Sequence, residues 1–234
     1  MPEPDATVVI VTKDRCDDAL AAVESALAQR PSVEVLVIDD GSSDGTATSI
    51  AAAFPTVRVK RHEDSAGLVV RRNEAARIVS APLIVSIDDD AVFTGPGSVA
   101  AAVGEFNDPR VGAVAMPYID LPQGEEILQR APGDGFYVTH RFRGTAHALR
   151  RDLFLEQGGY REMLFQQGEE PDLAIRMLDA GYVVRLGSGD PVRHFGSPSA
   201  TSTAAGSTSA GTRSCSRGIT CRCRTSSCAW RRCR

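Results

Sequence analysis

The sequence predicts an α/β protein built on a Rossmann-like, mostly parallel sheet flanked by helices. Apolar runs of strand length alternate with amphipathic helical segments between residues 7 and 93, in the order βαβαβαβ. The connections between them are short, as in a doubly wound sheet. Acidic residues follow two of the strands, at the edge of the sheet where such folds bind ligands.

Length and composition limit the classes of protein to which this chain can belong. A chain of 234 residues can form one large α/β domain, and 42% hydrophobic with 24% charged residues is typical of a soluble globular protein. No apolar run approaches the roughly 20 residues that span a bilayer, and residues 1–5 lack the pattern of a secretory signal. We therefore expect a cytoplasmic protein, with peripheral membrane association left open.

The last 36 residues differ in composition from the rest of the chain. Residues 1–198 contain all 30 acidic residues and 19 of the 26 Lys and Arg, a net charge of −11, whereas residues 199–234 contain seven Arg and five of the six Cys. The cysteine spacings lack the paired intervals of a zinc site. We predict a disordered Ser/Thr/Arg/Cys tail at 199–234, which could be translated out of frame, and the negative body argues against nucleic-acid binding.

The first half of the chain predicts four strands and three helices. The strands are expected at 7–12, 33–38, 57–60 and 83–87, and the helices at 16–27, from the turn after 46 to about 54, and at 66–79. Asp14 is the expected N-cap of the first helix.

The second half of the domain, residues 96–198, has a mixed pattern. Residues 120–137 are polar and predict only a loop region. Helices are expected at 97–106, 151–157 and 173–180, and strands at 111–116, 143–149 and 182–186, after which Val192-Arg193-His194-Phe195 follows without an assigned structure.

Three carboxylates, Asp88, Asp89 and Asp90, follow the fourth predicted strand. Adjacent acids repel one another, and partial burial at the end of a sheet raises the free energy of their charged forms, so a cation would stabilise them. Hard oxygen ligands suit Mg²⁺ or Mn²⁺. The alternative is a solvated acidic turn, which the position after a buried strand disfavours.

A second acidic group, Glu169, Glu170 and Asp172, precedes the predicted helix at 173–180. Pro171 suits an early helical position, because its missing N–H has no intrahelical partner there. Acids at a helix start are also stabilised by the helix dipole, so capping alone could explain them.

These motifs resemble family 2 of the inverting glycosyltransferases, whose members have the GT-A fold. The resemblance covers residues 7 to about 198, and its order and spacing make it specific although each motif alone is weak. The motifs are the strand Val8–Thr12, the acidic turn Val37–Thr46, Ala66-Gly67 with Arg72-Asn73, Ile87–Asp90, Gly158–Glu162, and Gly168–Leu173 with Arg176.

The resemblance implies a role for each half of the domain and for each motif. Residues 1–95 would bind the nucleotide sugar, and residues 96–198 would form the acceptor and catalytic half. Asp90 would ligate Mn²⁺ or Mg²⁺ directly and Asp88 would contact ribose or a metal-bound water, with His194 as a further metal ligand, although a lone His can also be structural. Glu170 occupies the position of the general base, and Glu169 would orient it. Nucleotide-sugar binding would fall to Thr12, Arg15, Asp39, Asp40, Arg72, Asn73, Asp88 and Asp89.

The implied reaction moves a sugar from a UDP-, dTDP- or GDP-sugar to an acceptor hydroxyl with inversion, in a metal-assisted single displacement. The acceptor could be a glycan, a lipid-linked molecule or a small molecule.

The chain departs from the family pattern at Glu169-Glu170, where Glu-Asp is usual, and at Arg15, where Asn is common. The alternative function is a truncated or inactive domain that binds nucleotide sugar without turnover. A dinucleotide-dependent oxidoreductase is disfavoured, because no Gly-x-Gly-x-x-Gly follows the first strand.

Overall fold

The computed structural model describes residues 5–164 and 168–196. These residues lie in one compact unit, which spans Met1–Ala200. The predicted disordered tail at 199–234 lies outside the described residues.

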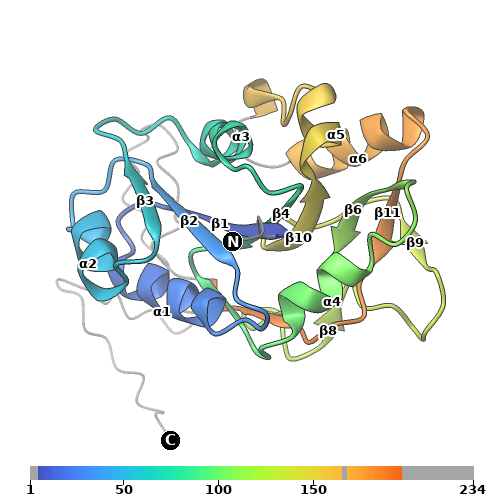
Figure 1. Ribbon diagram of the computed structural model, residues 1–234, viewed down its shortest axis with the longest axis horizontal. Helices are drawn as coiled ribbons and strands as arrows, with labels where there is room; N and C mark the ends of the chain where they lie inside the picture. The colour runs from blue at the N-terminus through green and yellow to red at the C-terminus, as the bar shows by residue number, and fades with distance from the viewer. Residues whose placement is uncertain (1–4, 165–167, 197–234) are drawn as a thin grey trace, which may run out of the picture. The chain divides into compact units, whose positions relative to one another are not determined.

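A sheet of eight strands forms the centre of the fold, in the order β3-β2-β1-β4-β10-β6-β11-β9 (Figure 1). Four neighbouring strands from the first half of the chain are parallel, as the alternation of strands and helices predicts. Val and Ile runs are buried in β1, β2 and β4, whereas β3 is a partly exposed strand at the edge of the sheet. Strand β10 is antiparallel to β4 and to β6, which makes the sheet mixed. The strands are β1 Ala6–Thr12, β2 Glu34–Asp39, β3 Arg58–Arg61, β4 Leu83–Asp88, β6 Val111–Ala115, β9 Val138–Thr139, β10 Ala146–Arg150 and β11 Val183–Leu186.

Helices cover both faces of this sheet. On one face pack α1 Cys16–Leu27, α2 Thr46–Ala53 and α4 Ser98–Gly104, and on the other α3 Leu68–Ile78, α5 Arg151–Glu156 and α6 Glu169–Asp179 (Figure 1). The short 3-10 helix η1 spans Glu162–Leu164. None of the helices in the described part of the chain is long and apolar enough to cross a membrane.

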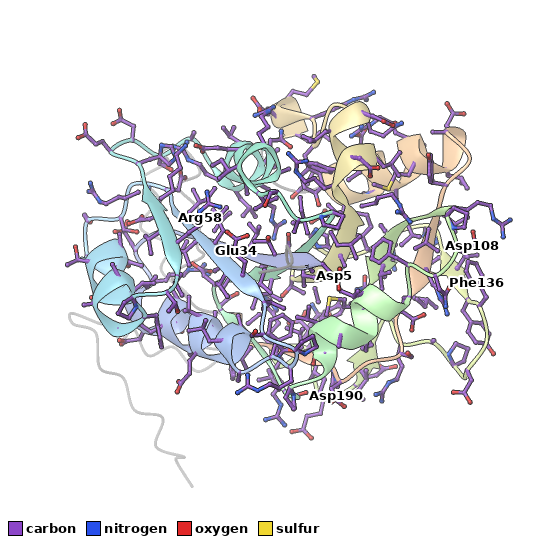
Figure 2. The ribbon with its side chains drawn as sticks, in the orientation of Figure 1. Asp5, Glu34, Arg58, Asp108, Phe136 and Asp190 are labelled. Atoms are coloured by element: carbon purple, nitrogen blue, oxygen red, sulfur yellow. The ribbon has the colours of Figure 1, made fainter. Side chains whose placement is uncertain are left out.

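Alternation along β1 shows how each face is filled. Val8 and Ile10 belong to the core with α1, whereas Val9 and Val11 belong to the core with α3. Successive side chains of a strand point to opposite faces, so a strand buried on both sides needs a continuous apolar run. At the amino-terminal end of the neighbouring strands, Glu34 and Arg58 form a partly exposed ion pair of 2.8 Å (Figure 2). Such a pair contributes little to stability.

A second sheet of four short strands has the order β5-β12-β7-β8. Its strands are β5 Ala91–Phe93, β7 Tyr118–Asp120, β8 Ile127–Leu128 and β12 Val192–His194. Strand β12 is antiparallel to β5 and parallel to β7, and His194 is paired with Ala91 on one side and Asp120 on the other. The end of the described chain is thereby held beside the acidic turn that follows β4.

Two predictions about local structure are wrong. Asp14 is not the N-cap of α1: Arg15 holds that position without a side-chain cap, and Asp14 has a φ of 52°. Its Oδ1 instead accepts hydrogen bonds from N and Oγ of Ser43, 2.7 and 3.0 Å away, so a tertiary contact has replaced the local cap. Residues 120–137 are not only a loop, because they contain β8, which is held by its pairing with β7.

Candidate active site

The carboxyl ends of β1, β2 and β4 bring three predicted site segments together. The parallel register pairs Thr12 with Asp39 and Val11 with Asp88, so the residues that follow these strands lie at one edge of the sheet. Ligands of doubly wound sheets bind outside this edge. Thr12 and Asp39 are buried there, while 26% of the Asp88 side chain is exposed.

A candidate metal centre is formed by Asp88, Asp90 and His194. Each can offer one ligand atom, and the three atoms lie within 4.8 Å of one another. Two carboxylates and an imidazole form a donor set that suits Mn²⁺, with the exposed part of Asp88 leaving an opening towards solvent. The β12–β5 pairing brings His194 to this cluster.

Charged neighbours set the electrostatics of this centre. Nε2 of His194 lies 3.3 Å from Oδ1 of Asp90, and Nδ1 lies 3.0 Å from Oδ1 of Asp120. The hydrogen bond with Asp90 raises the pKa of His194 to about 9, with a smaller contribution from Asp120. Burial raises the pKa of Asp89 to about 6 although Arg15 acts in the opposite direction.

Arg15 connects the loop after β1 to the acidic turn. Its Nη1 donates to Oδ1 of Asp89 at 2.7 Å and lies 3.2 Å from Oδ2 of Asp90. Asp90 therefore lies between a guanidinium on one oxygen and His194 on the other. Asp89 is used for this ion pair inside the protein, and its role towards a nucleotide stays a prediction.

Asp40, predicted to bind the nucleotide, accepts four hydrogen bonds from the loop and helix that follow β3. The donors are Oγ of Ser65 (2.6 Å), N of Ala66 (2.8 Å), N of Gly67 (2.9 Å) and Nε of Arg71 (2.6 Å). Burial alone would raise the pKa of Asp40, but these hydrogen bonds hold it below its usual range. A carboxylate has about four lone-pair positions, so Asp40 has little capacity left for a ligand.

The neighbouring Asp39 has more freedom to bind. Its Oδ1 accepts a hydrogen bond of 2.8 Å from N of Ser42. Its Oδ2 is buried without a hydrogen-bond partner in the described residues, and Nε of Arg61 lies 4.0 Å away. Oγ1 of Thr12 is likewise buried, and the hydroxyl of Thr12 lies close enough to Asp89 to act against the rise in the pKa of that carboxyl.

Asn73 and Arg72 of α3 face the interior of the protein. Asn73 accepts a hydrogen bond of 2.8 Å from N of Tyr160 and donates one of 2.8 Å to its O, which joins α3 to the turn before η1. Arg72 donates to Oδ1 of Asp88 at 2.7 Å and to O of Gly144 at 2.9 Å. Both residues are buried, and their assignment to nucleotide binding stays a prediction.

Glu169 and Glu170 begin α6, after Gly168. Gly168 has a φ of +101°, a left-handed conformation that favours glycine and turns the chain into the helix. Glu169 is 3% exposed, whereas the side chain of Glu170 is 14% exposed and lies 3.9 Å from Nη1 of Arg72. Burial raises the pKa of Glu170, with Arg72 acting in the opposite direction. A raised pKa brings a carboxylate closer to the range in which it can take up a proton at neutral pH.

Sequence reasoning missed several residues of this site. Asp120 holds Nδ1 of His194, and Gly144 lies against Arg72. Oη of Tyr160 and Nε2 of His147, both fully buried, are 3.0 Å apart behind the site. Tyr160 lies in the motif Gly158–Glu162, but that motif does not reveal its contact with His147. No local pattern marks the other positions, since each contact depends on pairing between distant segments.

Comparison of this sequence with known proteins identifies a family and several relatives. The family model described as glycosyl transferase family 2 matches residues 7–161. The succinoglycan biosynthesis protein ExoU of Rhizobium meliloti is 32% identical over 199 residues, which cover 76% of this chain and 58% of that protein. A pre-mycofactocin glycosyltransferase of Mycobacterium tuberculosis is 26% identical over 196 residues, which cover 77% of this chain and 40% of that protein. The chain thus spans about half the length of these relatives.

Solved structures show the same fold. The mannosyltransferase PcManGT of Pyrobaculum calidifontis, in complex with GDP-Man and Mn²⁺, has a TM-score of 0.69 at 23% identity, over 82% of this chain and 57% of that one. GalNAc-T7, with UDP, GalNAc and Mn²⁺, has a TM-score of 0.68 at 17% identity, over 83% of this chain and 44% of that one. These likenesses confirm the expected α/β fold of GT-A type. With the family model matching most of the chain, this protein belongs to glycosyl transferase family 2.

Proposed function

We propose that this chain transfers a sugar from a nucleotide-sugar donor to an acceptor hydroxyl, with inversion in a single displacement assisted by a divalent cation. The observation that carries this proposal is the pair of carboxylate centres at one edge of the sheet. One holds Asp88 and Asp90 with His194, and the other holds Glu170, which Arg72 joins to Asp88.

The first centre would bind the cation and the donor diphosphate. Asp88, Asp90 and His194 fit Mn²⁺ or Mg²⁺ by the chemistry of their donor atoms. The bound ion would offset the negative charge that develops on the departing nucleoside diphosphate. Asp120 fixes the orientation of His194, a support that metal-ligating His residues commonly have.

The second centre would take up the proton of the acceptor. In an inverting displacement, the acceptor hydroxyl attacks the anomeric carbon from the side opposite the departing diphosphate and loses its proton. Glu170 at the start of α6 would receive this proton at a carboxylate oxygen, while Glu169, the more buried of the two, would position the first turn of the helix.

The donor and acceptor are proposed by class. PcManGT was solved with GDP-Man and GalNAc-T7 with UDP, so UDP-, dTDP- and GDP-sugars are the donors to test. We assign residues 1–95 to the donor and residues 96–198 to the acceptor, which could be a glycan, a lipid-linked molecule or a small molecule. Peripheral membrane association would suit a lipid-linked acceptor.

The test combines binding with turnover. Isothermal titration with each nucleotide sugar, with and without Mn²⁺, should show binding that depends on the cation. Release of the nucleoside diphosphate, followed in the presence of pooled hydroxyl acceptors, should show turnover. Binding without any release would favour a domain that binds the donor only, and the absence of binding would contradict the proposal.

A further inference from the structure

Arg72 lies between the two carboxylate centres of the site. Its side chain is 4% exposed, and Nη2 donates both to Oδ1 of Asp88 at 2.7 Å and to O of Gly144 at 2.9 Å. Its Nη1 faces the other centre, 3.9 Å from Oε1 of Glu170. The planar guanidinium can hold two partners in fixed directions, which a lysine cannot do.

Gly144 is the position that leaves room for this contact. A Cβ added there would meet Oε1 of Glu170 at a separation that real Cβ atoms do not show, and would lie 2.7 Å from Nη1 of Arg72. Gly144 is not among the glycines with positive φ, so its backbone conformation does not require glycine. The space taken by Arg72 and Glu170 is therefore the reason that the structure gives for glycine at this position.

The polar groups around this contact are incompletely satisfied. Nη1 of Arg72, Oγ1 of Thr145 and Oε2 of Glu169 are buried and have no hydrogen-bond partner among the described residues. Thr145 follows Gly144 and Glu169 precedes Glu170 in the chain, and the charge of Glu169 acts on both Arg72 and Glu170. Unsatisfied buried groups are rare in native structures and gather at functional positions.

We propose that Arg72 is a positioning residue for the transfer reaction: its guanidinium joins Asp88, on the donor side, to Glu170, on the acceptor side, and the missing side chain of Gly144 lets this contact form. This inference rests on the proposed function for the roles of the two acids. It gives Arg72 a role inside the protein, coupling the base to the donor centre, in place of a direct contact with the nucleotide.

The charges that face Glu170 make the contact measurable. These charges are Arg72 on α3, Glu169 on its own helix and Asp88 at the end of β4, and the buried Tyr160 beside them stays neutral because burial raises its pKa. Arg72 is the cation of this group and favours the ionised form of Glu170, whereas burial and the nearby acids favour the protonated form. Loss of the Arg72 contact should therefore make Glu170 titrate at a higher pH.

The experiment compares Gly144→Ala with Gly104→Ala. Both replace a glycine outside the left-handed region, but a Cβ at position 104 meets nothing within 4 Å. Glutamate side chains are labelled with ¹³C, and the signal of Glu170 is identified by its absence in Glu170→Gln. We expect the titration midpoint of Glu170 to rise by about one pH unit or more in Gly144→Ala, as for the loss of a nearby opposite charge, and to stay unchanged in Gly104→Ala.

An unchanged or lower midpoint in Gly144→Ala would overturn the inference. If that variant folds poorly, Arg72→Lys tests the same contact, because a single ammonium cannot bridge both acids, and it should raise the midpoint as well. The titration does not depend on turnover. If the wild-type protein has no transferase activity but Gly144→Ala raises the titration midpoint of Glu170, the proposed function is contradicted and the coupling is supported. If the wild-type protein is active but Gly144→Ala leaves the midpoint of Glu170 unchanged, the coupling is contradicted and the proposed function is supported.

Discussion

Nε2 of His194 lies 3.3 Å from Oδ1 of Asp90, although one residue ends β12 and the other lies in the turn that follows β4. The antiparallel pairing of β12 with β5 produces this proximity. Two potential metal ligands from distant segments therefore meet at the carboxyl edge of the main sheet.

The first prediction concerns the cation. Asp90→Asn should abolish the Mn²⁺ dependence of UDP binding, because an amide is a much weaker ligand than a carboxylate for a hard divalent cation. Asp108→Asn is a matched control, since Asp108 pairs with Arg110 far from the site in sequence and fold. Titration calorimetry with and without Mn²⁺ measures the effect. Equal metal dependence in Asp90→Asn and wild type would contradict the metal assignment.

The second prediction concerns Asp40. Because its carboxylate accepts four hydrogen bonds, one of them from the buried Arg71, Asp40→Asn should lower the free energy of unfolding by about 3 kcal/mol. Urea unfolding at neutral pH measures this loss. If stability is unchanged and UDP affinity falls, Asp40 contacts the nucleotide directly, as the sequence predicts.

The same residue predicts a pH dependence of stability. The pKa of Asp40 in the folded protein lies below its ordinary value of 3.8. Its stabilising contribution is therefore complete above that pH and is lost as the pH falls through the lower folded-state pKa. The difference in unfolding free energy between wild type and Asp40→Asn should narrow below pH 3.8. If the difference in unfolding free energy between the two proteins stays constant on acidification, the charge of Asp40 is not the cause of its stabilising effect.

The third prediction concerns the base. Glu170→Gln keeps the shape of the side chain and removes its basicity, so turnover should fall by about 10²–10⁴-fold while donor affinity stays near that of wild type. Glu169→Gln should reduce turnover less. Steady-state rates of nucleoside diphosphate release give the comparison. The opposite ranking of the two variants would move the base to Glu169.

The fourth prediction concerns Asn73. Its amide exchanges two hydrogen bonds with the backbone of Tyr160, so Asn73→Ala should lower the free energy of unfolding by about 2 kcal/mol. UDP affinity per folded molecule should stay close to wild type if the role of Asn73 is to join α3 to this turn. A selective loss of UDP affinity at unchanged stability would instead support the nucleotide role that the sequence predicts.

The parallel half of the sheet could be predicted because its strands need continuous apolar runs, such as Val8 to Val11. The acidic turn after β4 could be predicted as well, because three adjacent acids follow an apolar run that indicates a buried strand. The second sheet could not be predicted in this way. Its strands contain two or three residues each, and β8 exists only through its pairing with β7. Short segments carry too little periodicity to be distinguished from a loop.

The sequence predicts which edge of the sheet holds the candidate site better than it predicts the hydrogen-bond partners of individual residues. Asp14 was expected to cap α1, but its carboxylate binds Ser43. The hydrogen bonds by which Asp40 holds the loop after β3 were likewise not predicted, and its contact with a nucleotide stays a prediction. Propensity favours local hydrogen bonds, and tertiary packing can supply better partners that the sequence does not reveal.

The second sheet also has a consequence for biosynthesis. Because ribosomes build the chain from its N-terminus, the parallel strands β1 to β4 and the acids Asp88 and Asp90 leave the exit tunnel long before β12. The cluster of potential metal ligands is complete only when His194 arrives and β12 pairs with β5. A nascent chain that ends before Val192 would contain all eight strands of the large sheet but only Asp88 and Asp90 of this cluster, so a metal ion that needs all three ligands would bind only after most of the described fold has been made.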